Sequence, residues 1–229
     1  MAEQDQIIKA GAIGWAAHGF LGRRWGVSDA AANAVLPGSE MITAEQVHSS
    51  DAIIVERAWN FANRPRADAL VTNRPGLLLA IVTADCAPVL LADQTAGVVG
   101  AAHAGWRGAH GGVIAATVQA MEELGAKPAR IAAAIGPCIA QESYEVDGRF
   151  RAQFGPGAAQ FFTPGKIAHH QFDLEAYVAF RLEQSGVGVI ERLGLDTYTD
   201  DTRFYSYRRA THRGQAADGR QLSLIGLTR

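Results

Sequence analysis

The chain has 229 residues, 48% of them hydrophobic, and this length and composition suit a folded protein with a substantial buried core. Its 21 basic and 23 acidic residues give a formal net charge of −2, so it lacks the strong positive field with which proteins bind nucleic acid or anionic membranes. The polar N-terminus is unlike a signal peptide and no run is apolar enough to span a membrane, which predicts a cytoplasmic protein. Two cysteines, Cys86 and Cys138, are too few for a disulfide framework and agree with a reducing compartment.

Three apolar runs with short connections occupy the centre of the sequence. They span residues 77–82, 89–91 and 98–102, and turn-forming residues separate them. Strands joined this closely pair in antiparallel fashion, so we expect an antiparallel meander.

Amphipathic helices are predicted to flank this sheet. Residues 112–124 place Ile114, Val118 and Met121 on one stripe, and a second helix is expected to follow Asp173 as its N-cap. Further strands are predicted at 130–135, 187–191, 204–207 and 222–227. With no internal repeat and no linker, residues 1–229 are predicted to form a single α+β domain with helices covering a largely antiparallel sheet.

Arginine is concentrated at the C-terminal end of the chain. Residues 203–229 hold one acidic residue, Asp218, against six arginines: Arg203, Arg208, Arg209, Arg213, Arg220 and Arg229. We interpret this segment as a solvated charged edge, with contact to a phosphate group as the alternative.

The predicted meander brings a thiol and an imidazole together. Its first strand ends just before Cys86 and its third ends near His103, so both residues fall at one edge of the sheet. Such a pair serves either as a nucleophile with its base or as two ligands of a soft transition metal. His48, which precedes another strand-like run, is the candidate third group, although a single His or Cys is more often structural.

A glycine-rich segment follows His103 and opens the helix predicted at 112–124. Gly105, Arg107 and Gly108 lie in it, and a helix start with an arginine suits a phosphate or another oxyanion. An ordinary glycine-rich turn explains the same residues equally well. Asp85, beside Cys86, either orients a ligand or base or caps a turn, and packing is the preferred role for Cys138.

Several segments together resemble the family of YfiH-type, laccase-like multicopper polyphenol oxidases, some of whose members are described as purine nucleoside phosphorylases. The resemblance extends from about residue 46 to the end of the chain, and the segments that carry it are residues 46–49, 68–72, 83–91, 103–108, 135–139 and 204–209. It implies a layered αββα fold and a zinc site formed by His48, Cys86 and His103. The segment from Phe20 to Met41 is shorter than in the family, and Asp196 replaces a cysteine of many relatives.

The resemblance also implies a reaction. Its members suggest phosphorolysis of adenosine, inosine, guanosine and methylthioadenosine, together with deamination of adenosine. His48, Cys86 and His103 would be both the metal ligands and the catalytic residues, and we expect Arg107, Gly105 and Gly108 to bind phosphate. Purine nucleosides and phosphate would be the partners.

Three alternatives remain open at this stage. The family's older name indicates a copper-dependent phenol oxidase, although seven histidines and no His-x-His sequence offer little beyond one mononuclear site. Cys86 and His103 also fit a metal-free hydrolase. The third alternative is a zinc-bearing interaction protein without catalysis.

Overall fold

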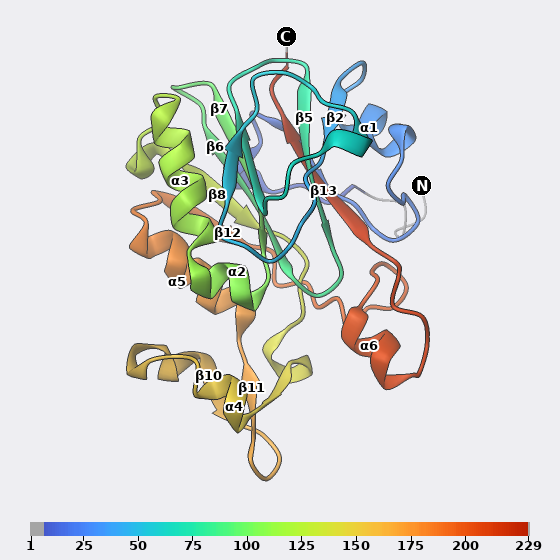
Figure 1. The fold of residues 1–229 in the computed structure, drawn as a ribbon, viewed down its shortest axis with the longest axis vertical. Helices are drawn as coiled ribbons and strands as arrows, with labels where there is room; N and C mark the ends of the chain where they lie inside the picture. Colours follow the sequence, from blue (N-terminus) through green and yellow to red (C-terminus); the bar gives the residue numbers. More distant parts are fainter. Residues whose placement is uncertain (1–6, 229) are drawn as a thin grey trace.

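Two β-sheets packed face to face form the centre of the molecule, and helices cover both outer sides (Figure 1). The computed structural model describes residues 7–228. One sheet has the strand order β1, β13, β5, β2, with the bounds Ala17–Phe20, Gln221–Gly226, Leu77–Thr83 and Glu40–Ile42. The other has the order β12, β8, β6, β7, β4, β3, with the bounds Val189–Arg192, Ala132–Ile135, Ala87–Asp93, Val98–Ala104, Ala69–Thr72 and Ala52–Ile54.

Helices lie on the outer face of each sheet. α3 (Val113–Glu123) and α5 (Leu174–Gln184) pack on the six-stranded sheet, and α1 (Asp29–Val35) packs on the four-stranded sheet (Figure 1). Both helices expected from the sequence are confirmed, and the Asp173 carboxylate accepts a hydrogen bond from the Ala176 amide at 2.8 Å as an N-cap. The shorter helices are α2 (Trp106–Gly111), α4 (Gly148–Arg151) and α6 (Tyr207–His212), with 3-10 turns at Gly11–Ile13, Phe61–Asn63, Pro128–Arg130, Gln141–Ser143 and Pro156–Phe161.

The apolar side chains divide among the layers by the alternation of strand residues. Along β6, Val89 and Leu91 join the core beneath α3 and α5, whereas Leu90 and Ala92 lie in the core between the sheets. A third cluster fills the space between the four-stranded sheet and α1. Strands buried on both faces read as continuous apolar runs, which is why β5, β6 and β7 are visible in the sequence.

A small third sheet extends beyond the two large ones (Figure 1). Its strands are β10 (Phe162–Pro164), β11 (His169–Phe172) and β9 (Glu145–Asp147), all paired antiparallel. A cluster of aromatic rings joins this sheet to α2 and α5, for example Trp106 against Phe150 with ring centroids 4.7 Å apart and Tyr144 against Phe172 at 5.8 Å. The cluster therefore fixes Trp106 and Tyr144 in place.

The α+β, layered αββα sandwich expected for this chain is confirmed, with sheets that are mixed rather than purely antiparallel. Most strand pairings among the described residues are antiparallel, but β12–β8, β2–β5 and β3–β4 are parallel. Within residues 7–228 no helix has the length and apolar character needed to cross a membrane.

Two details of the predicted strands are wrong. The three central runs do not form one meander, because β5 pairs with β13 and β2 while β6 and β7 pair in the other sheet. Asp85, at φ +84°, lies in the turn that carries the chain from one sheet to the other. Residues 204–207 form no strand; Ser206 instead caps α6 by accepting a hydrogen bond from the Arg209 amide at 3.1 Å.

Candidate metal centre and pocket

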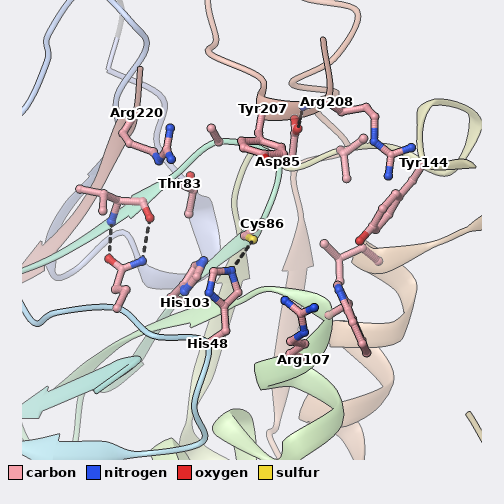
Figure 2. Close-up of a pocket in the computed structure, with 16 residues that line it drawn as sticks. His48, Thr83, Asp85, Cys86, His103, Arg107, Tyr144, Tyr207, Arg208 and Arg220 are labelled. Atoms are coloured by element: carbon pink, nitrogen blue, oxygen red, sulfur yellow. Dashed lines mark hydrogen bonds between the residues drawn. The ribbon is translucent and has the colours of Figure 1, made fainter. Parts of the chain in front are cut away.

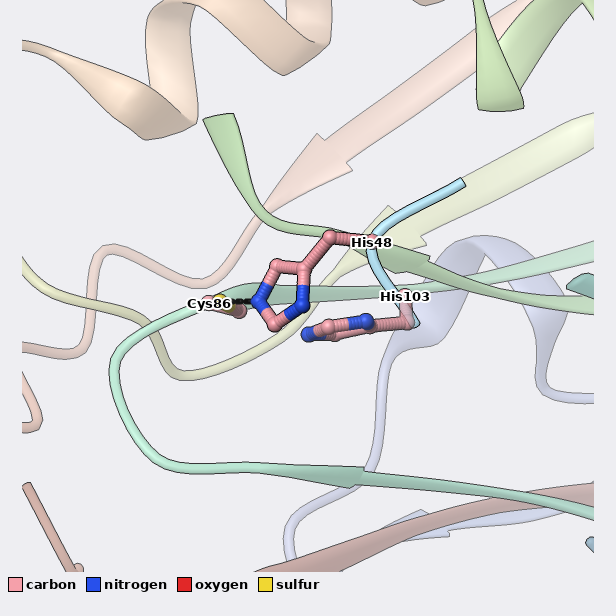
Figure 3. A group of neighbouring side chains, drawn as sticks. All are labelled: His48, Cys86 and His103. Carbon is pink, nitrogen blue, oxygen red and sulfur yellow. Dashed lines mark hydrogen bonds between the residues drawn. The ribbon is translucent and has the colours of Figure 1, made fainter. Parts of the chain in front are cut away.

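His48, Cys86 and His103 meet at one place in the structure (Figure 3). His48 lies in the loop between β2 and β3, Cys86 in the turn between β5 and β6, and His103 on β7. Their potential ligand atoms all lie within 4.8 Å of one another, and the Cys86 Sγ is 3.8 Å from the His48 Nε2. Among the described residues this is the one cluster of three or more metal-binding side chains.

The register of β6 and β7 explains why two of the three residues, Cys86 and His103, lie close together. Pro88 faces His103 and Ala87 faces Ala104, so Cys86, directly before β6, falls beside His103. The predicted placement of the thiol and the imidazole at one sheet edge is confirmed even though β5 belongs to the other sheet.

Asp68, which is completely buried, forms hydrogen bonds with the His103 ring and with the backbone of the loop that carries His48. Its carboxylate accepts hydrogen bonds from the backbone amides of Val47, His48 and Ser49, at 3.1, 3.0 and 2.6 Å. It also lies 2.7 Å from the His103 Nδ1, which leaves the Nε2 of that ring free for a ligand. His48 has a φ of +60°, and the hydrogen bonds from the three backbone amides to Asp68 keep its loop in this left-handed conformation.

The electrostatics of the cluster favour a thiolate. Burial by itself would raise the pKa of the Cys86 thiol, but His103 and His48 outweigh that effect and lower the pKa to about 6. Burial would likewise lower the pKa of His103, yet Cys86 and Asp68 raise it to about 9. Burial opposes ionisation of Asp68 too, and its hydrogen bonds with His103 and the Ser49 amide lower its pKa to about 2.

Two glycines let α2 approach the cluster closely. A Cβ atom on Gly105 would lie 2.8 Å from the Cys86 Sγ and 3.1 Å from the His48 Cδ2. A Cβ atom on Gly108 would lie 3.1 Å from the Ser49 carbonyl oxygen. Close packing therefore accounts for both glycines independently of any bound phosphate, Gly105 against the side chains of Cys86 and His48 and Gly108 against the backbone of Ser49.

The cluster opens into a pocket of about 550 Å³ (Figure 2). The side chains around the cluster are a mixture of apolar, aromatic and basic groups: Gln46, Val82, Thr83, Ala84, Asp85, Trp106, Arg107, Ile139, Tyr144, Leu174, Tyr207, Arg208 and Arg220. Arg107, Arg208 and Arg220 form no ion pair with any carboxylate of residues 7–228. The pocket therefore has a strongly basic lining for a protein of negative net charge.

Asp85, next to Cys86 in the sequence, is connected to one wall of the pocket by hydrogen bonds. Its carboxylate accepts hydrogen bonds from the Thr197 hydroxyl and the Arg208 amide, both at 2.7 Å. Asp85 therefore lies in the turn, as one interpretation of the sequence expected, but its carboxylate fixes the start of α6, with Tyr207 and Arg208, over the pocket and forms no hydrogen bond with the three residues of the cluster.

The sequence profile of a family described as multi-copper polyphenol oxidoreductase laccase matches residues 24–228. The chain belongs to this laccase family. A protein of Rickettsia conorii named purine nucleoside phosphorylase is 38% identical over 190 residues, which cover 81% of this chain and 78% of that protein. A protein of Deinococcus radiodurans with the same name is 47% identical over 162 residues, covering 71% of this chain and 62% of that protein.

Solved structures of this laccase family share the whole architecture. YfiH of Bacillus licheniformis superposes with a TM-score of 0.85 at 26% identity, covering 100% of this chain and 98% of YfiH. YlmD from Geobacillus stearothermophilus superposes with a TM-score of 0.84 at 28% identity, covering 96% and 94% of the two chains. The family description and the names of the purine nucleoside phosphorylase relatives support an enzyme that acts on small molecules.

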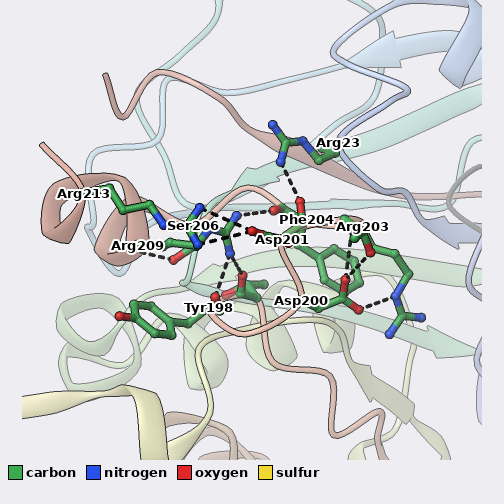
Figure 4. A network of polar contacts seen from close by, with 11 residues as sticks. Arg23, Tyr198, Asp200, Asp201, Arg203, Phe204, Ser206, Arg209 and Arg213 are labelled. Carbon is green, nitrogen blue, oxygen red and sulfur yellow. Dashed lines mark hydrogen bonds and ion pairs between the residues drawn. The ribbon is translucent and has the colours of Figure 1, made fainter. Parts of the chain in front are cut away.

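The arginine-rich segment of this laccase-family chain is not simply a solvated edge. Arg208 and Arg220 line the pocket, and Arg209 is only 7% exposed. The Arg209 guanidinium donates to the carbonyl oxygens of Thr197, Tyr198 and Phe204 (Figure 4). Arg203 and Arg213 do pair at the surface with Asp200 and Asp201, while Arg229 lies outside the described residues.

Asp196 forms no part of the cluster of His48, Cys86 and His103. Its carboxylate accepts hydrogen bonds from the Ser143 hydroxyl at 2.7 Å and from the Ala140 and Tyr198 amides at 3.0 and 2.9 Å. The residue therefore organises a loop beside Cys138, which is buried and free.

Proposed function

We propose that this protein is a zinc-dependent purine nucleoside phosphorylase. The observation that carries the proposal is the cluster of His48, Cys86 and His103 at the floor of a pocket with aromatic and arginine side chains. The printed names of its relatives support the choice of purine nucleosides as substrates.

The donor set fits zinc. One thiolate and two imidazoles are a donor set that zinc prefers, and the potential ligand atoms of Cys86, His48 and His103 all lie within 4.8 Å of one another. The lowered pKa of Cys86 supplies the thiolate, and Asp68 orients His103 as carboxylates do for metal-binding histidines. Zinc bound there would supply Lewis-acid chemistry, with one coordination position left for substrate.

The pocket residues have separate tasks in this proposal. The rings of Trp106, Tyr144 and Tyr207 offer flat surfaces for a purine base. Arg107, whose guanidinium lies 4.9 Å from the centre of the Trp106 ring, binds phosphate at the start of α2, beside Gly105 and Gly108.

The reaction exchanges one bond at the sugar. The C1′–N9 bond of adenosine, inosine, guanosine or methylthioadenosine breaks, and a bond forms between C1′ and a phosphate oxygen. The electron pair leaves with the base, which gains the proton of hydrogen phosphate, and the second product is the pentose 1-phosphate. Adenosine deamination, in which water replaces the amino group and ammonia leaves, is proposed for the same site.

Two competing functions have specific support. The family description favours copper and phenol oxidation, yet residues 7–228 offer one cluster of three or more metal-binding side chains, too little for a multicopper centre. The low pKa of Cys86 and the high pKa of His103 favour a metal-free hydrolase in which Cys86 attacks an acyl group and His103 transfers the proton.

Product analysis separates these functions. Purified protein of measured zinc and copper content is incubated with inosine or adenosine, with and without phosphate. We expect free base and ribose 1-phosphate only when phosphate is present, and loss of at least a hundredfold in rate for His48→Ala, as for the loss of a metal ligand (about 10²-fold or more). The exposed His212, outside the cluster, provides the matched control His212→Ala.

Other outcomes would support one of the competing functions. Phenol oxidation that follows copper content would establish the laccase activity instead. Ester hydrolysis that survives zinc removal and is abolished by iodoacetamide would establish the Cys86 hydrolase. Absence of base, inosine and ribose 1-phosphate under every condition would overturn the purine proposal.

A further inference from the structure

The basic side chains of the pocket lie in two places rather than one (Figure 2). Arg107 and Arg208 lie on the side of Tyr144 and Trp106, and both also line an adjoining cavity of about 480 Å³. Arg220 lies on the other side of Cys86, near Thr83, and does not reach that second cavity. A single phosphate would occupy only one of these places.

Two backbone carbonyl groups fix the position of the Arg220 guanidinium. Its Nη1 donates to the carbonyl oxygens of Ala217 and Gly219 at 2.8 and 2.7 Å, which fixes the guanidinium just before β13. No other hydrogen bond or ion pair engages this guanidinium within residues 7–228, so its Nε and Nη2 hydrogens remain available. A fixed guanidinium with free hydrogens suits a carboxylate or phosphate group.

Thr83 provides an independent observation at the same end of the pocket. It is only 1% exposed, and its hydroxyl oxygen has no hydrogen-bond partner among the described residues. The neighbouring Gln46 amide hydrogen-bonds to the Val82 amide and carbonyl, both at 2.8 Å, and not to the Thr83 hydroxyl. Buried hydroxyl groups are nearly always paired, so a bound ligand is the natural missing partner.

The proposed function leaves this second place without a ligand. Purine nucleosides are neutral, and the inorganic phosphate is assigned to Arg107. We propose that Arg220 and Thr83 form a second oxyanion subsite that binds an anionic substituent of the substrate itself, so that purine nucleoside 5′-phosphates are the preferred substrate class. The inference rests on the proposed function, because it assumes a purine substrate in this pocket.

Calorimetric binding in the absence of phosphate tests the subsite without requiring turnover. The probes are inosine and inosine 5′-phosphate, titrated into zinc-loaded protein. We expect the wild-type protein to bind the 5′-phosphate more tightly, and Arg220→Gln to reduce that preference by about tenfold, as for the loss of one charged hydrogen bond. Thr83→Val keeps the shape of the side chain and should reduce the preference by a smaller factor. Arg57 is exposed and does not line the pocket, so the control variant Arg57→Gln should keep the wild-type preference for inosine 5′-phosphate over inosine.

Kinetics with inosine distinguish the two sources of an oxyanion. Arg107→Gln should raise the KM for inorganic phosphate more than Arg220→Gln does. The reverse order, or equal wild-type affinity for inosine and its 5′-phosphate, would overturn the subsite. If Arg220→Gln weakens 5′-phosphate binding but no nucleoside is cleaved, the subsite stands and the proposed reaction fails.

Discussion

At the scale of single residues, the arrangement of His48 and Cys86 depends on the absence of a side chain at Gly105. Gly105 has space for hydrogen only, because a Cβ atom would lie 2.8 Å from the Cys86 Sγ. We therefore expect Gly105→Ala to displace Cys86 or His48 and to lower zinc affinity by about 10- to 100-fold, the loss typical of disturbed ligand geometry. Zinc competition with a chromogenic chelator measures this loss.

A matched control lies at the other end of the helix that Gly105 precedes. Gly111, the last residue of α2, has no atom within 4 Å of a Cβ position, so Gly111→Ala should bind zinc as the wild-type protein does. Equal zinc affinity of the Gly105 and Gly111 variants would contradict the close packing described for Gly105. Far-ultraviolet circular dichroism verifies that both variants are folded.

The sequence predicted His48, Cys86 and His103 as a group but not Asp68, which contacts His103 and the His48 amide. Cys86 and His103 could be placed together because the β6–β7 hairpin is local. Asp68 contacts the amide of residue 48 and the ring of residue 103, which lie 20 and 35 positions away. Its role depends on the pairing of β4 with β7 and on the approach of the loop that carries His48, which an aspartate before an apolar run does not by itself indicate.

At the scale of secondary-structure elements, Asp93 fastens the end of β6 to the turn before β8. Its completely buried carboxylate accepts hydrogen bonds from the Lys127 amide and the Arg130 Nε, both at 2.9 Å, and from the Ala96 amide at 3.1 Å. Burial alone would raise its pKa, but Arg130 and the amides outweigh burial and hold the pKa below its usual value. Asp93→Asn should therefore reduce the free energy of unfolding at pH 7 by about 1–3 kcal/mol.

The pH dependence of that difference has a definite sign. A carboxylate whose pKa is lower in the folded than in the unfolded state stabilises the fold above its unfolded pKa, which is about 3.9. The contribution of Asp93 is lost as the pH falls through its lower folded value. Urea denaturation should give a constant difference between wild type and Asp93→Asn from pH 7 to 5, and a shrinking one below about pH 4. A stability difference that grows on acidification would refute the role given to the Asp93 carboxylate. The exposed Asp51 provides the control variant Asp51→Asn.

Elements with local partners were predictable, and those with distant partners were not. The stripe of α3 and the N-cap of α5 are local signals, and both helices form where expected. β5 was visible as an apolar run, but its main partner is β13 at the other end of the chain, so its sheet could not be assigned. Residues 204–207 have aromatic side chains typical of a strand, yet the Ser206 cap and the hydrogen bond that the Arg208 amide donates to the Asp85 carboxylate favour a helix start.

At the scale of the whole molecule, the candidate metal centre joins parts of the chain that belong to different layers. Cys86 follows a strand of the four-stranded sheet, His103 lies on the six-stranded sheet, and His48 lies on a loop between them. The ligands come together only when both sheets are folded and packed. The proposed zinc binding would therefore be coupled to the folding of the whole molecule.

This coupling predicts that zinc raises the thermal stability of the protein. A ligand that binds only the folded state stabilises it by about 4 kcal/mol at a thousandfold excess over its Kd, so removing zinc with dipicolinate should lower the Tm by several degrees and adding zinc should restore it. Cys86→Ala should abolish the shift. Cys138→Ala is the matched control, since Cys138 is buried outside the cluster and its loss should lower the Tm with and without zinc alike. A zinc-dependent shift that survives in Cys86→Ala would mean that zinc binds elsewhere, and the function proposed for this cluster would have to be abandoned.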